Sequence, residues 1–163
     1  MATIITKEQQ EKEKMVTLVS SDSEKFVVEQ KVAEKSHVIK MVMNCCGIES
    51  PIPVRRVKGD ILKSILEYCE KHSKGEAQEV MEKWDKEYMD KAEKDLVFFH
   101  DLMLASHFLH IQELVDLIAV TFAGMLKMKS PEEIRQKFNI NNDLTKEQEE
   151  HIMTTFGWAF QPI

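Results

Sequence analysis

Residues 130–152 of this chain have the sequence SPEEIRQKFNINNDLTKEQEEHI, which contains two helix-start signals. Ser130 begins one S/T-x-x-E/Q capping box and Thr145 begins another, and Pro131 occupies the first helical position, where proline is favoured. The NINND segment between the two boxes supplies the Asn and Asp residues of a turn. The sequence therefore predicts two helices here, joined by a turn.

These two helices offer few apolar residues for packing. The first has Ile134 and Phe138, and the second has Ile152, Met153 and Phe156. A stripe this thin cannot bury enough apolar area to hold a separate domain against its conformational entropy. We therefore expect the segment to be an appendage of a larger domain.

Large apolar side chains near these helices have no local partner in the sequence. Leu144 precedes the second cap, where a hydrophobic staple would require an apolar residue at the position of Glu149. Ile140 lies in the turn, and Trp158 and Phe160 lie near the end of the chain. Burying a handful of such groups against another chain, at about 25 cal/mol per Å2, contributes on the order of 10 kcal/mol before association costs. The pattern favours a partner-binding appendage, and the alternative is two helices that fold back onto the domain.

The composition is that of one soluble domain with an acidic balance. Of the 163 residues, 43% are hydrophobic, which is enough for a sizeable core. The 22 Lys and Arg against 28 Asp and Glu give a net charge of -6, which disfavours nucleic acid as a partner. The most apolar run, Leu117–Leu126, spans ten residues against the roughly 20 that a membrane helix requires, so no membrane partner is expected.

The N-terminal residues 1–14 lack the apolar stretch of a secretory signal and are expected to form a disordered tail. Cys45, Cys46 and Cys69 lack the spacing of a zinc site or of a secreted disulfide framework, which favours reduced thiols in an intracellular protein over a strained Cys45–Cys46 disulfide. The motifs GxSxG, HExxH, GxGxxG and the P-loop are absent from the sequence. We therefore expect no enzyme activity, no cofactor and no small-molecule substrate.

Three histidines raise one catalytic alternative. His100, His107 and His110 are spaced so that they could share one face of a continuous helix. Three imidazoles can hold a metal ion, but no carboxylate that would orient them and no metal-binding motif accompanies these three. We expect unrelated polar positions and no metal, and a metal-dependent enzyme is the alternative.

The order of the segments predicts an α+β fold. Two β-branched runs, at residues 16–19 and 26–28, flank the turn-rich SSDSE and are expected to form a hairpin. Ser36 can cap a short helix after it. A short edge strand is expected near Val54–Val57, after the proline-containing SPIPV. Strands come first and helices later, without βαβ alternation.

Apolar spacing predicts the later helices. One is expected at about Asp60–His72, with its apolar face toward the core. The polar residues 73–95 are expected to form a loop and then a short helix, with Trp84 pinning the loop to the domain. Residues 98–108 and 111–126 are apolar on nearly all sides, which is typical of helices that lie between other elements.

The residues from about Asp95 to Trp158 resemble the S-phase-kinase-associated (Skp) adaptors of the Skp-cullin-F-box ubiquitin ligases. The match to SPEEIRQKFNIxND(F/L)T is close and runs without a gap, and weaker similarity covers VSSDSEKFVVE, SPIPV and WDKEYM upstream. The final GWAF is most similar to the plant members. The resemblance covers roughly residues 15–160.

This resemblance implies an α+β BTB/POZ domain over residues 15–127, a small sheet with surrounding helices, and a C-terminal extension of F-box-binding helices over residues 128–163. It implies an adaptor subunit that bridges F-box proteins to a cullin in ubiquitin-dependent protein degradation, in the cytoplasm and the nucleus. By matching position, the F-box-binding residues would be Met103, Phe122, Leu126, Phe138, Ile140, Leu144 and Trp158.

The cullin-binding face departs from the family pattern. The family binds cullin through a face centred on an Asn-Tyr pair within ILAANYL, and this chain has MLASHFL there, with His107 and Phe108 in the cullin-binding positions. The tyrosine hydroxyl is absent, and a titratable ring replaces an uncharged amide. His100 stands where the family has Phe, and Arg55-Arg56 where it has Pro-Asn. The alternative is therefore a diverged paralogue that binds F-box proteins but has weakened or lost cullin binding.

Overall fold

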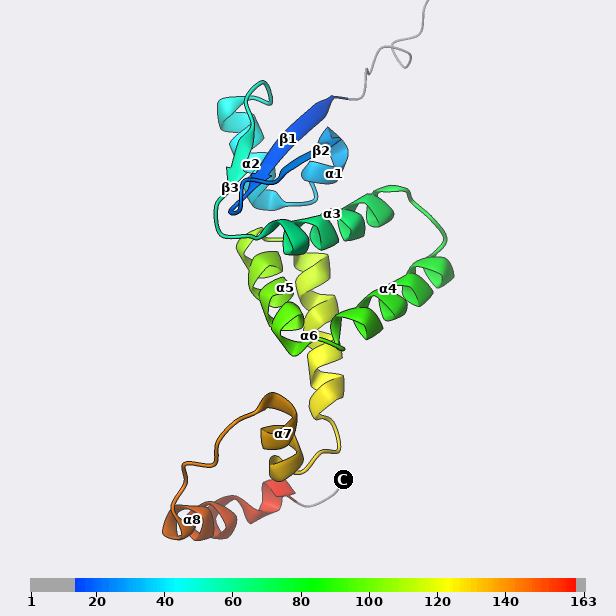
Figure 1. The fold of residues 1–163 in the computed structure, drawn as a ribbon. Helices are drawn as coiled ribbons and strands as arrows, with labels where there is room; N and C mark the ends of the chain where they lie inside the picture. Colours follow the sequence, from blue (N-terminus) through cyan, green and yellow to red (C-terminus); the bar gives the residue numbers. More distant parts are fainter. Residues whose placement is uncertain (1–13, 161–163) are drawn as a thin grey trace, which may run out of the picture. The chain divides into compact units, whose positions relative to one another are not determined.

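The computed structural model describes residues 14–160, so the predicted N-terminal tail over residues 1–14 lies outside them except for Lys14. Two strands, β1 (Met15–Ser20) and β2 (Lys25–Glu29), pair antiparallel across a turn, which confirms the predicted hairpin. A third strand, β3 (Ile52–Val54), pairs parallel with β1. The sheet therefore has the order β2-β1-β3 (Figure 1).

The third strand begins two residues earlier than the sequence predicted. Ile52 and Val54 are buried while Pro53 between them is exposed, which is the alternation of a half-buried strand. Pro53 is tolerated because β3 is an edge strand, where a missing backbone N–H breaks no ladder bond. The prediction near Val54–Val57 was wrong in position because Arg55 and Arg56 form a turn instead of extending the strand.

Helices make up most of the remaining chain, and their order after the early strands confirms the predicted α+β class. The helical elements among the described residues are α1 (Gln30–Ala33), α2 (His37–Cys46), α3 (Gly59–Ser73), α4 (Gln78–Ala92), α5 (Leu96–Phe108), α6 (Gln112–Leu126), α7 (Pro131–Phe138), α8 (Lys146–Phe156) and a 3₁₀ helix at Gly157–Phe160.

The core lies where α3 meets the sheet on one side and α5 on the other (Figure 1). The predicted apolar face of α3 is buried, as expected; it consists of Ile61, Leu62, Ile65, Leu66 and Cys69. Leu18 of β1, Leu102 of α5 and Ile118 of α6 are each 0% exposed. Because α5 packs on α3 in this core, the residues at the end of α5 lie in a fixed position beside residues 55–58, which connect β3 to α3.

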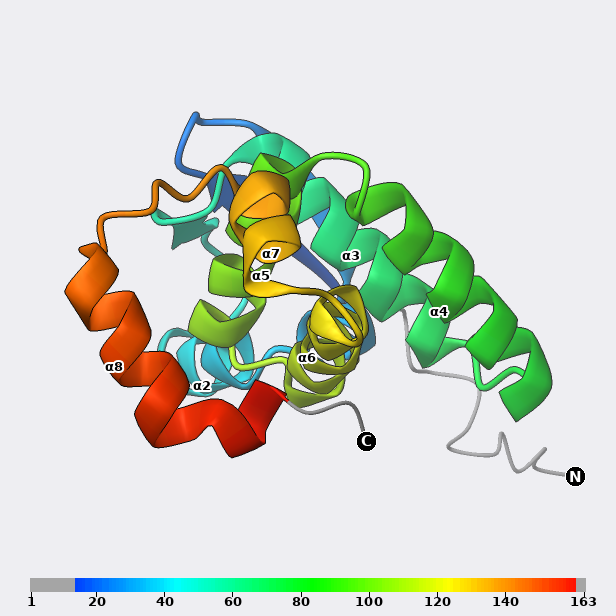
Figure 2. The same ribbon diagram turned by 90° about the horizontal axis from the view of Figure 1, so that it is seen from below.

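The fourth helix is longer than predicted. α4 spans 15 residues instead of a loop and a short helix. Glu, Lys, Gln and Met dominate its sequence, and these residues favour helix even where few apolar side chains mark a buried face. Only Tyr88, Met89 and Ala92 of α4 are buried. Seen from below, α4 runs next to α3 (Figure 2).

The described chain divides into two compact units between Met125 and Leu126, so that α6 ends at the division. The predicted functional limits, 15–127 and 128–163, stay a prediction. Among residues 14–160, every helix is too short or too polar to cross a membrane.

Candidate partner-binding surfaces

Local hydrogen bonds start both helices of the C-terminal unit. Ser130 Oγ accepts a hydrogen bond from the Glu133 N–H at 3.2 Å, and Glu133 Oε2 accepts one from the Ser130 N–H at 2.7 Å. Thr145 and Gln148 repeat this reciprocal arrangement at the start of α8. Both predicted capping boxes are confirmed. Neither α7 nor α8 contains a buried residue, so these caps, rather than a core, specify where the helices begin.

Five of the F-box-binding positions that the family resemblance implies lie in this unit, and none of them is buried. Ile140 is 54% exposed, Leu144 is 37% exposed and Trp158 is 75% exposed. Leu126 and Phe138 are half-buried. An apolar side chain of this size that stays in water leaves area available for a partner.

Leu144 is left without a hydrophobic staple, as its sequence context predicted. Glu149, at the position that a staple would use, accepts a hydrogen bond from Asn142 Nδ2 at 2.6 Å. The Leu144 N–H donates to Asn142 Oδ1 at 3.3 Å. These hydrogen bonds hold the turn before α8, and the Leu144 side chain takes no part in them.

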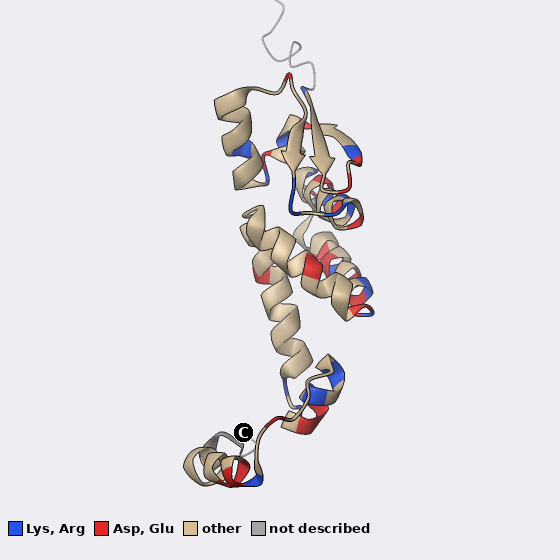
Figure 3. Ribbon diagram, turned by 60° about the vertical axis from the view of Figure 1, so that its left-hand side comes forward, with Lys and Arg blue, Asp and Glu red and all other residues tan. Residues whose placement is uncertain are grey.

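The other two predicted F-box-binding residues lie in the N-terminal unit. Met103 of α5 and Phe122 of α6 are half-buried. The Phe122 ring stacks on Phe99 of α5, with 6.4 Å between centroids and 23° between ring planes. After Asp116, α6 carries no charged residue, and Figure 3 shows its later turns without charge. This part of α6 therefore presents an uncharged surface.

The prediction that α5 and α6 are covered on nearly all sides was wrong. Val97 is 71% exposed, Leu104 is 54% exposed and Val120 is 73% exposed. Each helix packs one face into the core, through residues such as Leu102 and Ile118, and within residues 14–125 its other apolar residues stay exposed. These apolar residues are surface residues, which is the pattern of an interaction surface.

The predicted cullin-binding residues lie together on a pocket at the end of α5. This α5 pocket has a volume of about 510 Å3. The residues that matter to its chemistry are Arg56, Lys58, Asp101, Leu104, His107 and Phe108. The Arg56 guanidinium lies over the Phe108 ring, with its Cζ 5.6 Å from the ring centroid. This is within the range of a cation–π interaction, which contributes about 0.5–1 kcal/mol at an exposed site.

The acidic side chain of the α5 pocket, Asp101, has a lysine and a histidine as close neighbours. Lys58 Nζ lies 3.4 Å from Asp101 Oδ2, and His100 Nδ1 lies 3.5 Å from Asp101 Oδ1. His107 is exposed at the rim of the pocket. The rim therefore combines paired charges with the cation of Arg56 and the ring of His107.

Trp84 packs against α3, so it has a structural role, as predicted. It joins helix α4 to the domain, however, and not a loop. Its ring stacks on Tyr88 with 5.0 Å between centroids and lies 6.2 Å from the Tyr68 ring. His72 stacks on Tyr68 at 4.0 Å, and its Nε2 lies 2.7 Å from Asp85 Oδ1. These rings join α4 to α3 and leave Trp84 half-buried.

The three histidines do not share one continuous helix, so the condition on which the metal alternative depended is not met. α5 ends at Phe108, and His110 lies in the following turn with a positive φ of 54°. In the described part of the chain, no three His, Cys, Asp or Glu side chains come together as metal ligands.

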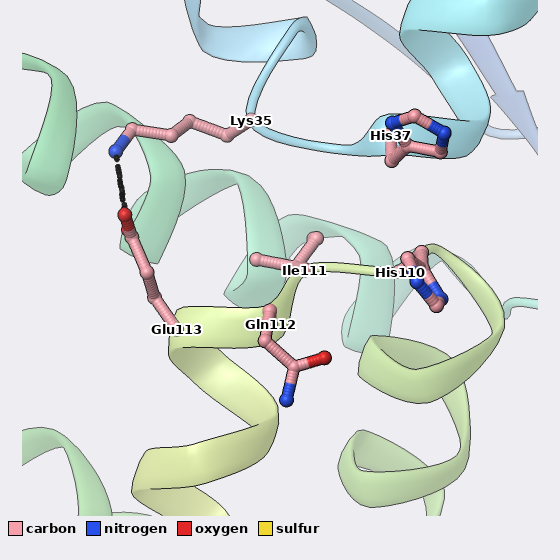
Figure 4. Close-up of a pocket in the computed structure, with 6 residues that line it drawn as sticks. All are labelled: Lys35, His37, His110, Ile111, Gln112 and Glu113. Atoms are coloured by element: carbon pink, nitrogen blue, oxygen red, sulfur yellow. Dashed lines mark hydrogen bonds and ion pairs between the residues drawn. The ribbon is translucent and has the colours of Figure 1, made fainter.

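His110 instead lines a second pocket, of about 380 Å3, with His37 (Figure 4). The two ring centroids are 5.9 Å apart, and the Lys35–Glu113 ion pair, at 3.1 Å, lies at the other side of the pocket. Because the charges of Lys35 and Glu113 cancel, this ion pair gives the pocket no net charge that would attract a charged ligand.

Comparisons with known proteins agree along most of the chain. The profile of the Skp1 family tetramerisation domain matches residues 14–74, and that of the Skp1 family dimerisation domain matches residues 112–159. SKP1-like protein 14 of Arabidopsis thaliana is 40% identical over 146 residues, which are 90% of this chain and 97% of that protein. The chain belongs to the Skp1 family.

Two further relatives support this assignment. SKP1-like protein 11 of Arabidopsis thaliana is 41% identical over 152 residues, covering 91% of this chain and 98% of the relative. Suppressor of kinetochore protein 1 of Schizosaccharomyces pombe is 38% identical over 158 residues, covering 88% of this chain and 96% of the relative. The resemblance found in the sequence is confirmed, and with it the BTB/POZ-type α+β fold.

Arg56 is the residue that sequence reasoning left out of the site. Arg55-Arg56 was recognised as a departure from the family pattern, but its position before α3 gave no link to His107 and Phe108 on α5. The structure brings the guanidinium of Arg56 over Phe108. One signal in the sequence could have linked them: Arg55-Arg56 and His107-Phe108 both depart from the family pattern, so they could have changed together at one site.

Proposed function

We propose that this chain is the adaptor subunit of a Skp-cullin-F-box ubiquitin ligase, acting in the cytoplasm and the nucleus. It binds an F-box protein and links it to a cullin for ubiquitin-dependent protein degradation, by holding proteins together rather than by making or breaking bonds. Membership of the Skp1 family supports this function. The observation that carries it is the exposure of Ile140, Leu144 and Trp158 in a unit whose helices bury no residue.

The proposed F-box-binding residues are Met103, Phe122, Leu126, Phe138, Ile140, Leu144 and Trp158. Their contribution is hydrophobic, because all seven are apolar and none is fully buried. At about 25 cal/mol per Å2 of apolar area, covering several of them is enough for a specific complex after association costs.

Co-purification of a truncated chain with an F-box protein tests this function. A chain that ends after Lys129 lacks α7 and α8 but keeps β1 to α6 and the core around α3. We expect it to fold, with a cooperative thermal transition, and to lose F-box capture. Capture at full-length affinity by the folded, truncated chain would refute the proposal.

The second candidate function is that of a paralogue that binds F-box proteins and has weakened or lost cullin binding. The observation that favours it is the composition of the α5 pocket, where His107 and Phe108 stand at the proposed cullin-binding positions and Arg56 covers Phe108. Such a chain would compete for F-box proteins or serve as a specialised scaffold.

Binding to a cullin separates the two candidates. The full-length chain, purified with its F-box protein, is tested for cullin capture beside the variant His107→Asn with Phe108→Tyr. Capture by the wild-type chain supports the ligase adaptor. Capture by the variant alone supports the paralogue, because the two substitutions restore the hydroxyl and the amide of the family pattern.

A further inference from the structure

The α5 pocket combines apolar walls with an unpaired cation. Leu104 is 54% exposed and Phe108 is 37% exposed, and both line the pocket. Val57 and Ile61, which are buried, close it from the side of α3. A concave site with apolar walls and one placed charge is suited to a ligand that carries both features.

Arg56 supplies that charge. It makes no ion pair and no hydrogen bond with any residue that the structure describes, and its contact with Phe108 is through the ring face. A guanidinium carries five N–H donors, and two of them match the two oxygens of a carboxylate. The Phe108 ring thus contacts a carboxylate-binding group whose donors have no hydrogen-bond acceptor among the described residues.

The other charges of the pocket favour the same ligand. Asp101 is paired with Lys58, at 3.4 Å, so it does not oppose an incoming carboxylate as a bare anion would. The segment VRRVK at residues 54–58 carries three cations and no anion, in a chain with a net charge of -6. The pocket is therefore a local basic site on an acidic protein, which attracts an acidic partner segment.

We propose that the α5 pocket docks a partner-protein segment that presents a carboxylate beside a large apolar side chain. Arg56 selects the carboxylate, and Leu104 and Phe108 receive the apolar group. This inference rests on the proposed adaptor function, because an adaptor binds a protein partner at this pocket. The inference adds the chemistry that the partner segment must have.

Short fluorescein-labelled peptides with a central Leu-Phe pair test the proposal. One peptide flanks the pair with Glu, a second with Gln and a third with Lys, and each is titrated into the full-length chain by fluorescence anisotropy. We expect the Glu peptide to bind about tenfold or more tighter than the Gln peptide, because a charge-assisted bidentate contact is added. The difference should shrink as salt is raised, since an exposed charge contact is screened.

A matched pair of variants assigns the effect to Arg56. Arg56→Gln should abolish the preference for Glu over Gln, whereas Arg55→Gln, which removes the same charge from an exposed neighbour outside the pocket, should keep it. Leu104→Ala, which removes apolar contact without adding a charge, should weaken the Glu and Gln peptides alike. Equal affinity for these two peptides, or a preference that Arg55→Gln removes as fully as Arg56→Gln, would overturn the proposal.

Capture of an F-box protein is measured on the same preparations. If F-box capture is intact and the peptides are not discriminated, this inference fails and the adaptor function stands. If F-box capture is absent while Arg56-dependent discrimination remains, the adaptor function fails and the pocket chemistry stands.

Discussion

Ser36 Oγ donates a hydrogen bond to the Leu109 carbonyl oxygen at 2.6 Å, which joins the start of α2 to the end of α5 across 73 residues of sequence. The same oxygen accepts the Ile39 N–H at 3.2 Å as the N-cap of α2. Ser36 is only 2% exposed. One buried hydroxyl therefore serves two elements, and it holds the chain directly after Phe108, at the α5 pocket.

The substitution Ser36→Ala should lower the free energy of unfolding by about 2 kcal/mol, because it removes a helix cap and leaves the Leu109 carbonyl without this bond. Urea unfolding, followed by circular dichroism, measures the change. Ser73→Ala is the control, since Ser73 makes only a local bond to the Glu70 carbonyl, and it should change stability by less than about 0.5 kcal/mol. A Ser36→Ala protein as stable as the wild type would show that the Leu109 contact contributes nothing.

Ser36 shows which contacts can be predicted from the sequence and which cannot. Its role as a cap follows from its place before an apolar helix, because that signal is local. Its bond to Leu109 is not predictable in the same way, because the partner is distant in the sequence. The capping boxes at Ser130 and Thr145 were predicted for the same reason as the cap at Ser36. The position of β3 was missed because the turn at Arg55-Arg56 has no strong local signature.

The same distinction between local signals and distant contacts applies to the candidate surfaces. Ile140 and Trp158 were predicted to lack a local partner, because the two thinly apolar helices beside them offer little to cover a large side chain, and both are exposed. The apolar character of α6 was recognised, but the exposure of Val120 was not, because hydrophobicity on all sides of a helix does not say which sides have a neighbour. Arg56 was missed because its contact with Phe108 depends on the packing of α3 against α5.

Trp158→Ala should weaken F-box binding by at least about thirtyfold, because tryptophan is among the residues that most often contribute about 2 kcal/mol or more when a partner buries them. Isothermal titration calorimetry with a purified F-box protein measures the affinity. Thermal stability should be unchanged, since Trp158 is 75% exposed. Val80→Ala, an exposed apolar position on α4, should leave the affinity as it is. Equal affinities for both variants would remove Trp158 from the proposed surface.

Thr145→Ala should reduce the helicity of α8 in the free protein. The Thr145 hydroxyl oxygen accepts the Gln148 N–H, and losing an N-cap costs about 1 kcal/mol in a helix that has no buried residue to compensate. Amide hydrogen exchange over residues 146–156 measures the loss, and exchange within α3 should not change. Thr155→Ala lies near the other end of the same helix, away from the N-cap, and should preserve its protection, because Ala favours helix. Normal protection of α8 in Thr145→Ala would mean that contacts other than the cap hold the helix.

The free energy of unfolding should fall as the pH rises above 9. Burial raises the pKa of the Cys69 thiol from its ordinary value of 9.0 to about 12, and burial also raises the pKa values of Tyr68 and Tyr88 above 10.0. Above pH 9 the unfolded chain therefore loses protons that the folded chain retains, so unfolding becomes easier with rising pH. Urea unfolding at a series of pH values measures the slope. Cys69→Ala should make the slope shallower between pH 9 and 12, whatever its effect at neutral pH. An unchanged slope in this variant would show that the thiol ionises as readily in the folded protein as in the unfolded chain.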